Sequence, residues 1–118
     1  MDFQQSQPIF LQIADWLSDK VISGEIPTGG QMPSVREIAS ETGVNPNTVQ
    51  RAVERLLLNG IIQSQRGKGN FLTPDARERI INERKQRFFE QQLPRLAAEM
   101  RVLGLPLEQI EKELKKLM

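Results

Sequence analysis

The side chains best suited to contact a charged polymer gather in the middle of the sequence, from Met32 to Asn70. This segment carries five basic and three acidic residues, a net charge of +2, in a chain whose overall net charge is only +1. It also holds a cluster of amide and hydroxyl side chains with an arginine over residues 45–51. Arginine can bind guanine or phosphate in a bidentate manner, and asparagine and glutamine can pair with adenine edges. The residue types therefore predict nucleic-acid contact by a small basic surface.

The composition argues against most catalytic chemistry. The 118 residues include no cysteine and no histidine, so thiol nucleophiles, disulfides and the commonest zinc ligands are missing. Serine hydroxyls and carboxylates are present without a base that would activate them. The GKG at residues 67–69 lacks the GxxxxGK spacing of a nucleotide-binding loop. We therefore expect no enzymatic activity, no metal and no cofactor.

Two short helices are expected to position the polar cluster. Ser34 and Glu37 have the spacing of a capping box, which starts a helix, and Gly43 suits the left-handed residue that ends it. Asn45 is a favoured N-cap and Pro46 suits the first position of a helix, so a second helix begins there. Two helices joined by a glycine in this way predict a helix-turn-helix.

The second helix of the motif has one apolar and one polar face, and Gly60 ends it. The apolar positions recur at helical spacing: Val49, Ala52, Val53, Leu56 and Leu57. The polar side chains left pointing outward are Asn47, Thr48, Gln50, Arg51 and Arg55. The predicted core face and the predicted binding face therefore lie on opposite sides of one helix.

A β-hairpin follows the helix-turn-helix. Ile61 to Gln65 alternates apolar and polar residues, RGKG follows, and the alternation resumes at Asn70. A hairpin in this place is the wing of a winged-helix domain. Arg66 and Lys68 fall at its tip, where their charges can reach a phosphate or a groove; the alternative is a solvated loop tip.

An amphipathic helix from Pro8 to Gly24 precedes the motif. Trp16 lies within its apolar stripe, so we expect core packing rather than base stacking. A turn follows, and residues 31–32 are expected to form a short extended piece before the capping box. No apolar run approaches the roughly 18 residues that span a bilayer, and the N-terminus lacks the pattern of a signal peptide. We expect no membrane association and a cytoplasmic protein.

The tail from residue 74 changes to long, charged helix formers around a wide apolar stripe. Pro94 interrupts it, which predicts a kink near Glu90 to Leu93 or two separate helices. Gly104 ends this element and Pro106 starts a last helix. Helices of this kind cannot enclose their own apolar surface. We therefore expect a homodimer; the alternative is a monomer whose tail folds back.

The expected fold is mainly α with a small β-hairpin. Residues 1–73 would form a winged helix-turn-helix DNA-binding domain and residues 74–118 a C-terminal α-helical dimerisation region. The residues expected at the dimer contact are Ile81, Phe88, Phe89, Leu93, Leu96, Met100 and Leu103. A small ligand beside Phe88 and Phe89 is the alternative to dimer packing. No other residue pattern in the tail indicates a small-molecule effector.

Residues from Pro8 to Leu72 resemble the DNA-binding domain of the GntR family of bacterial transcription regulators. The resemblance is carried by PIFLQIADWL, MPSVREIA, GVNPNTVQRAVERLLLNGII and QRGKGNFL. The short helical tail resembles that of the YtrA subfamily. Two positions depart from the family pattern: Asn70 stands where threonine is more usual, and Pro94 breaks the helix that forms the dimer in relatives.

The resemblance implies a winged helix that binds operator DNA as a dimer. The second motif helix would lie in the major groove, and the tip from Arg66 to Gly69 would enter the minor groove. The residues that match DNA-contacting positions are Ser34, Arg36, Asn45, Pro46, Asn47, Thr48, Gln50, Arg51, Arg66, Gly67, Lys68 and Gly69.

These observations lead to two hypotheses. The first is a sequence-specific repressor on an inverted-repeat operator with half-sites about one helical turn apart. The subfamily resemblance implies that it controls a transporter operon. The second is a winged-helix module that binds another protein and no operator DNA. The polar face of the second motif helix favours the first, because protein interfaces are richer in aromatic side chains.

Overall fold

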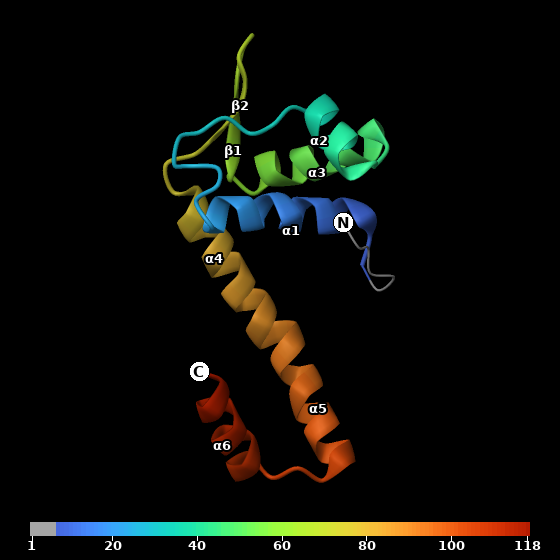
Figure 1. Ribbon diagram of the computed structural model, residues 1–118, viewed down its shortest axis with the longest axis vertical. Coiled ribbons are helices and arrows are strands. Elements are labelled where there is room, and N and C mark those ends of the chain that lie inside the picture. The colour runs from blue at the N-terminus through green and yellow to red at the C-terminus, as the bar shows by residue number, and fades with distance from the viewer. Residues whose placement is uncertain (1–6) are drawn as a thin grey trace. The chain divides into compact units, whose positions relative to one another are not determined.

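The structure is a computed structural model that describes residues 7–118, and it divides into two compact units at Asn82 and Glu83. The elements of the first unit are α1 (Ile9–Ile22), α2 (Val35–Thr42), α3 (Pro46–Leu58), β1 (Ile62–Gln65), β2 (Gly69–Leu72) and the first part of α4 (Ala76–Arg87) (Figure 1). The division lies within α4. A functional boundary after residue 73 stays a prediction.

Apolar side chains from every helix of the first unit meet in one core. The buried members are Ile13, Ala14, Leu17, Val21, Ile26, Met32, Ile38, Val49, Ala52, Val53, Leu56, Ile61, Ile62, Leu72, Ala76 and Ile80. The apolar stripes predicted for α1 and α3 face this core, and Ile38 joins them from α2. Burial of these side chains is the main force that holds the three helices together. Trp16 packs against the core and is half-buried, which confirms its expected structural role.

α4 contributes more to this core than the sequence indicated. Ile80 is 1% exposed, although its place in the apolar stripe of the tail suggested that it belonged with the later helices. The Nε of Arg77 also donates a hydrogen bond to the Ile22 carbonyl at 3.2 Å. The start of α4 is therefore part of the first unit and helps to close it.

The helix ends that define the motif have the expected caps. The Glu37 N–H donates to the Ser34 hydroxyl at 3.1 Å, and the Ser34 N–H donates to the Glu37 carboxylate at 3.2 Å. Gly43 has φ 71°, a conformation that costs a side chain with a Cβ about 1–2 kcal/mol. Asn45 caps α3 and Pro46 opens it. The helix-turn-helix is therefore encoded by signals that lie within a few residues of each helix end.

The hairpin is antiparallel and pairs Ile62 with Leu72 and Gln65 with Gly69. The chain before α2 adds an isolated bridge between Gln31 and Phe71, which confirms the expected extended piece. This bridge covers one edge of β2, so the hairpin does not stand as an isolated two-stranded ribbon.

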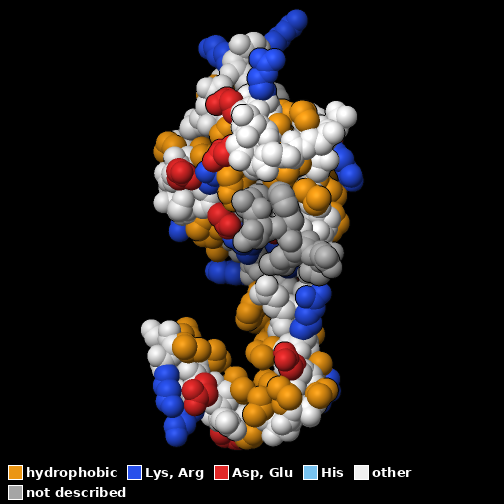
Figure 2. Space-filling view, turned by 45° about the vertical axis from the view of Figure 1, so that its right-hand side comes forward, with side chains coloured by type: hydrophobic (Ala, Val, Ile, Leu, Met, Phe, Trp, Pro, Cys, Tyr) orange, Lys and Arg blue, Asp and Glu red, His pale blue; other side chains and the backbone are white. Residues whose placement is uncertain are grey.

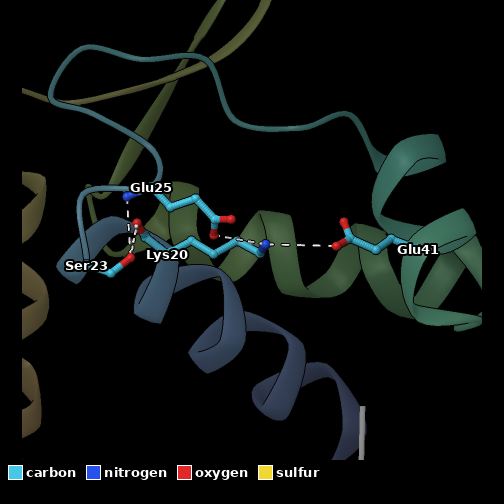
Figure 3. A network of polar contacts seen from close by, with 4 residues as sticks. All are labelled: Lys20, Ser23, Glu25 and Glu41. Atoms are coloured by element: carbon cyan, nitrogen blue, oxygen red, sulfur yellow. Dashed lines mark hydrogen bonds and ion pairs between the residues drawn. The ribbon is translucent and has the colours of Figure 1, made fainter.

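A polar network joins the end of α1 to the end of α2 (Figure 3). Lys20 Nζ lies 3.1 Å from the Glu25 carboxylate and 3.9 Å from that of Glu41. Ser23 donates from its hydroxyl to the Lys20 carbonyl and accepts from the Glu25 N–H. The same ammonium lies 4.5 Å from the centre of the Trp16 ring. Lys20 thus ties α1, the turn after it and α2 together.

The second unit is helical. After the last part of α4 it contains a π-helical turn, η1 (Phe88–Gln92), then α5 (Leu93–Leu103) and α6 (Leu107–Leu117). The backbone stays helical at Arg87, Gln92 and Leu93, and the π turn separates two α-helices, α4 and α5. The interruption predicted for Pro94 is the π turn itself. The Leu93 N–H donates to the Phe88 carbonyl five residues back, which is the hydrogen bond of a π-helix.

α5 and α6 leave their apolar side chains uncovered in the single chain. Gly104 ends α5 at φ 67°, and the Leu105 N–H returns to the Met100 carbonyl at 2.9 Å. No residue of α5 or α6 is buried. Figure 2 shows hydrophobic side chains gathered over this unit. Over residues 7–118, no helix is long and apolar enough to cross a membrane.

Candidate nucleic-acid interface

The predicted contact residues of α3 form one exposed surface at the start of that helix. Asn45, Pro46, Asn47, Gln50 and Arg51 are exposed, and Thr48 is half-buried. Residues 45–48 form the N-cap and the first turn of the helix, and Gln50 and Arg51 lie in the next turn. The structure therefore brings these residues together.

The start of α3 is electropositive. No acidic residue lies in its first turn, whereas the first turn of α2 contains Glu37. The helix dipole places a partial positive charge there, which favours a nearby phosphate by about 0.3–1 kcal/mol. The Asn45 side-chain oxygen accepts the Asn47 N–H at 2.8 Å, so the cap uses that oxygen and leaves the NH₂ group to donate elsewhere.

Two of these side chains have partners that the sequence did not reveal. The guanidinium carbon of Arg51 lies 4.2 Å from the centre of the Phe10 ring, a cation–π contact between α3 and α1. The Gln50 amide donates to the Glu54 carboxylate at 3.4 Å on the same helix. Arg51 therefore has its guanidinium held in place before any ligand arrives.

Ser34 and Arg36 lie at the start of α2, and both are exposed. The Ser34 hydroxyl oxygen accepts the Glu37 N–H, but its own O–H can still donate to a phosphate. Arg36 is in the first turn of α2. Both residues are therefore accessible to a ligand.

The wing carries the remaining predicted contacts. Arg66 and Lys68 are exposed, and Figure 2 shows Lys and Arg side chains gathered at the free end of the hairpin. The Lys68 N–H donates to the Gln65 carbonyl at 2.9 Å, with Gly67 at φ 76° inside the turn. A positive φ at this position needs glycine. Gly69 begins β2 instead of lying in the loop, with φ 107°.

Asn70 has a clear role in the wing. It pairs with Ser64 across the strands, and the Ser64 hydroxyl donates to its side-chain oxygen at 2.8 Å. The departure from threonine at position 70 therefore still allows a hydrogen bond between the strands.

A second hydroxyl secures the base of the hairpin. The Thr73 hydroxyl donates to the Gly60 carbonyl at 2.7 Å and the Ile61 carbonyl at 3.2 Å.

A small hollow of about 130 Å³ lies beside the base of the wing. It is lined by the end of α1, the turn after it, residues 72–74 and the start of α4. Its lining is mixed, and the residues with polar side chains are Ser23, Thr28, Thr73 and Arg77. Within residues 7–118, no group of carboxylates could hold a metal ion.

The comparisons with known proteins agree with this geometry. Residues 10–72 match the family described as "Bacterial regulatory proteins, gntR family". The chain belongs to this family. As a GntR-family protein it is a DNA-binding transcriptional regulator, and regulators of this family are not enzymes.

Two relatives in Bacillus subtilis match nearly the whole chain. The uncharacterized HTH-type transcriptional regulator YhcF is 39% identical over 108 residues, which are 92% of this chain and 88% of YhcF. The HTH-type transcriptional repressor YtrA is 32% identical over 117 residues, which are 99% of this chain and 89% of YtrA. The GntR-family resemblance inferred from the motifs is thereby confirmed.

A solved structure shares the fold. The crystal structure of a GntR-family transcriptional regulator from Bacteroides thetaiotaomicron superimposes with a TM-score of 0.79 at 34% identity. The match covers 93% of this chain and 96% of that one. The predicted fold, a winged helix followed by a helical segment, is confirmed.

Proposed function

We propose that this GntR-family regulator is a cytoplasmic homodimeric repressor of an inverted-repeat operator. The observation that supports the proposal is the exposure of the polar residues at the start of α3, at the start of α2 and at the basic wing tip. These residues offer amide, hydroxyl and guanidinium donors, the groups that read base edges and bind phosphates.

In this proposal α3 enters the major groove with its N-terminal end toward the bases. Asn47, Thr48, Gln50 and Arg51 face base edges, while the amides at the start of the helix approach a phosphate. Ser34 and Arg36 bind the adjoining backbone. Arg66 and Lys68, on the glycine-containing tip, enter the minor groove.

The proposed dimer forms through the second unit. Phe88, Phe89, Leu93, Leu96 and Leu103 are between 39% and 63% exposed, which is unfavourable for large apolar side chains in water. Met100 of this unit is half-buried, and the half-buried Ile81, in the part of α4 that belongs to the first unit, completes the proposed set. Residues 74–118 would then act as the dimerisation region, and two winged helices would meet half-sites about one helical turn apart.

Repression is proposed because YtrA, similar over almost its whole length, is named a repressor. Control of a transporter operon is proposed from the resemblance to its subfamily. Selection of bound duplexes from a random pool would give the operator itself, and the genes beside that sequence would identify the target.

The first test removes one phosphate-binding and one base-facing side chain. Arg36→Ala and Thr48→Ala should each weaken binding to the selected duplex by about tenfold or more in a gel-shift assay, because each loses contacts with DNA. Their thermal melts should match the wild type. Lys112→Ala, which removes a positive charge from exposed α6, should bind DNA normally.

The dependence on salt gives a second readout of the same assay. Each neutralised phosphate releases counterions, so affinity should fall steeply as salt rises. Full DNA binding by both variants, or a flat salt dependence, would reject the proposal. A monomer that ignores all DNA would favour the protein-interaction alternative.

A further inference from the structure

The side chain of Gln31 reaches the tip of the wing from a distant part of the sequence. Its Nε2 donates a hydrogen bond to the Lys68 carbonyl at 2.8 Å, across 37 positions of the chain. Gln31 precedes α2 and belongs to neither strand of the hairpin. The contact therefore links the start of the helix-turn-helix to the wing tip.

The backbone around Gln31 fixes where that side chain begins. The Leu72 N–H donates to the Gly30 carbonyl at 2.9 Å, and the Met32 N–H donates to the Asn70 carbonyl at 2.8 Å. Figure 1 shows this segment running beside the hairpin on its way to α2. These bonds hold residues 70–72 of β2, but they stop short of the tip. The Gln31 side chain extends the same support to Lys68.

Gly69 makes room for this contact. A Cβ built at Gly69 would lie 2.9 Å from Gln31 Nε2, too close for the amide to stay where it is. Gly69 also has φ 107°, which disfavours any other residue. Glycine is therefore required at position 69 both to leave space for the Gln31 amide and to adopt the positive φ.

We propose that Gln31 is a positioning residue for DNA recognition, which holds the wing tip in the shape that presents Arg66 and Lys68 to the minor groove. This inference rests on the proposed operator binding. Gln31 is exposed, so its hydrogen bond adds little to folding stability. A tip that is already ordered loses less conformational freedom when it binds DNA, and this lower entropic cost raises the affinity.

The test replaces Gln31 by methionine, which keeps the length of the side chain and loses the donor. Binding of Gln31→Met to the duplex selected by the wild type should be roughly three- to tenfold weaker, the size expected for one hydrogen bond. Its melting temperature should be unchanged, and hydrogen exchange of the Lys68 amide should be faster. Gln63→Met, at an exposed position on β1, is the matched control and should bind like the wild type.

A double-mutant cycle separates positioning from a general structural effect. In an Arg66→Ala, Lys68→Ala background the Gln31→Met change should cost no further affinity, because the tip no longer carries the charges that Gln31 positions. The same loss in both backgrounds, or wild-type affinity of Gln31→Met, would overturn the inference. If the wild type itself retains no duplex from the pool, the proposed function fails; if only Gln31→Met behaves normally, the inference alone fails.

Discussion

At the scale of single residues, the candidate interface depends on how its long side chains are held. A free arginine loses about 0.5–1.5 kcal/mol of rotamer freedom when a ligand immobilises it. Arg51 has lost part of that freedom already, because its guanidinium stacks on Phe10. A guanidinium that lies over an aromatic ring can still use its N–H donors for bidentate recognition.

This contact predicts that Phe10 supports DNA binding without touching DNA. Phe10→Leu should weaken operator binding by about two- to fivefold, since an exposed cation–π contact is worth about 0.5–1 kcal/mol. Leucine keeps most of the apolar contact with the core, so the melt should fall only slightly. Titration of the selected duplex in the wild-type and Arg51→Ala backgrounds measures the coupling. An equal loss in both would assign the effect to core packing instead.

At the scale of elements, the π turn η1 allows a proline in the interior of a helix. Pro94 lacks the N–H that an α-helix would bond to the Glu90 carbonyl, and its ring clashes with that carbonyl. A π turn adds the equivalent of one residue, which rotates the flanking helical faces relative to each other by about 100°. Phe88 and Phe89 lie within the turn and Leu96 and Leu103 follow it, so the turn sets how these side chains align.

Pro94→Ala should therefore maintain or raise the helix content while it weakens self-association. Alanine restores the hydrogen bond, so circular dichroism should show equal or higher helix content and no loss of stability. The apolar positions on either side of the turn would no longer line up, so sedimentation should show weaker self-association. Unchanged self-association would mean that the proposed dimer does not depend on this alignment.

At the scale of the whole molecule, the two units differ in whether they bury their apolar side chains. The first unit buries its apolar side chains in a continuous core. The second unit buries none from η1, α5 or α6. A second copy of the chain would cover such a surface most economically, because two identical patches match by symmetry.

The proposed contact can be tested with two substitutions on α5. Leu96 belongs to the proposed contact set and is 40% exposed, whereas Val102 is 85% exposed and lies outside that set. Leu96→Arg should shift the protein toward monomer in sedimentation and weaken operator binding, because a buried unpaired charge is costly. Val102→Arg should leave both properties unchanged. Dimers of equal strength in both variants would exclude the proposed contact.

The local architecture could be read from the sequence because its signals act over a few residues. The Ser34–Glu37 capping box, the Asn45–Pro46 helix start and the Gly67 turn each involve neighbours in the chain, and the structure contains all three. Helical periodicity identified the buried faces of α1 and α3 for the same reason. The family resemblance then supplied the winged helix and its DNA-binding role.

Only the tertiary structure decided which distant side chains meet. Nothing in the local pattern pairs Gln31 with Lys68 or Arg51 with Phe10, because periodicity identifies a face without naming what lies against it. The same limit explains why periodicity alone places Ile80 in the apolar stripe of the tail, whereas the fold buries it in the first core. The sequence by itself determined the elements, their ends and the residue types available to contact DNA. The tertiary structure determined how those residues are supported, because that depends on contacts between segments far apart in the chain.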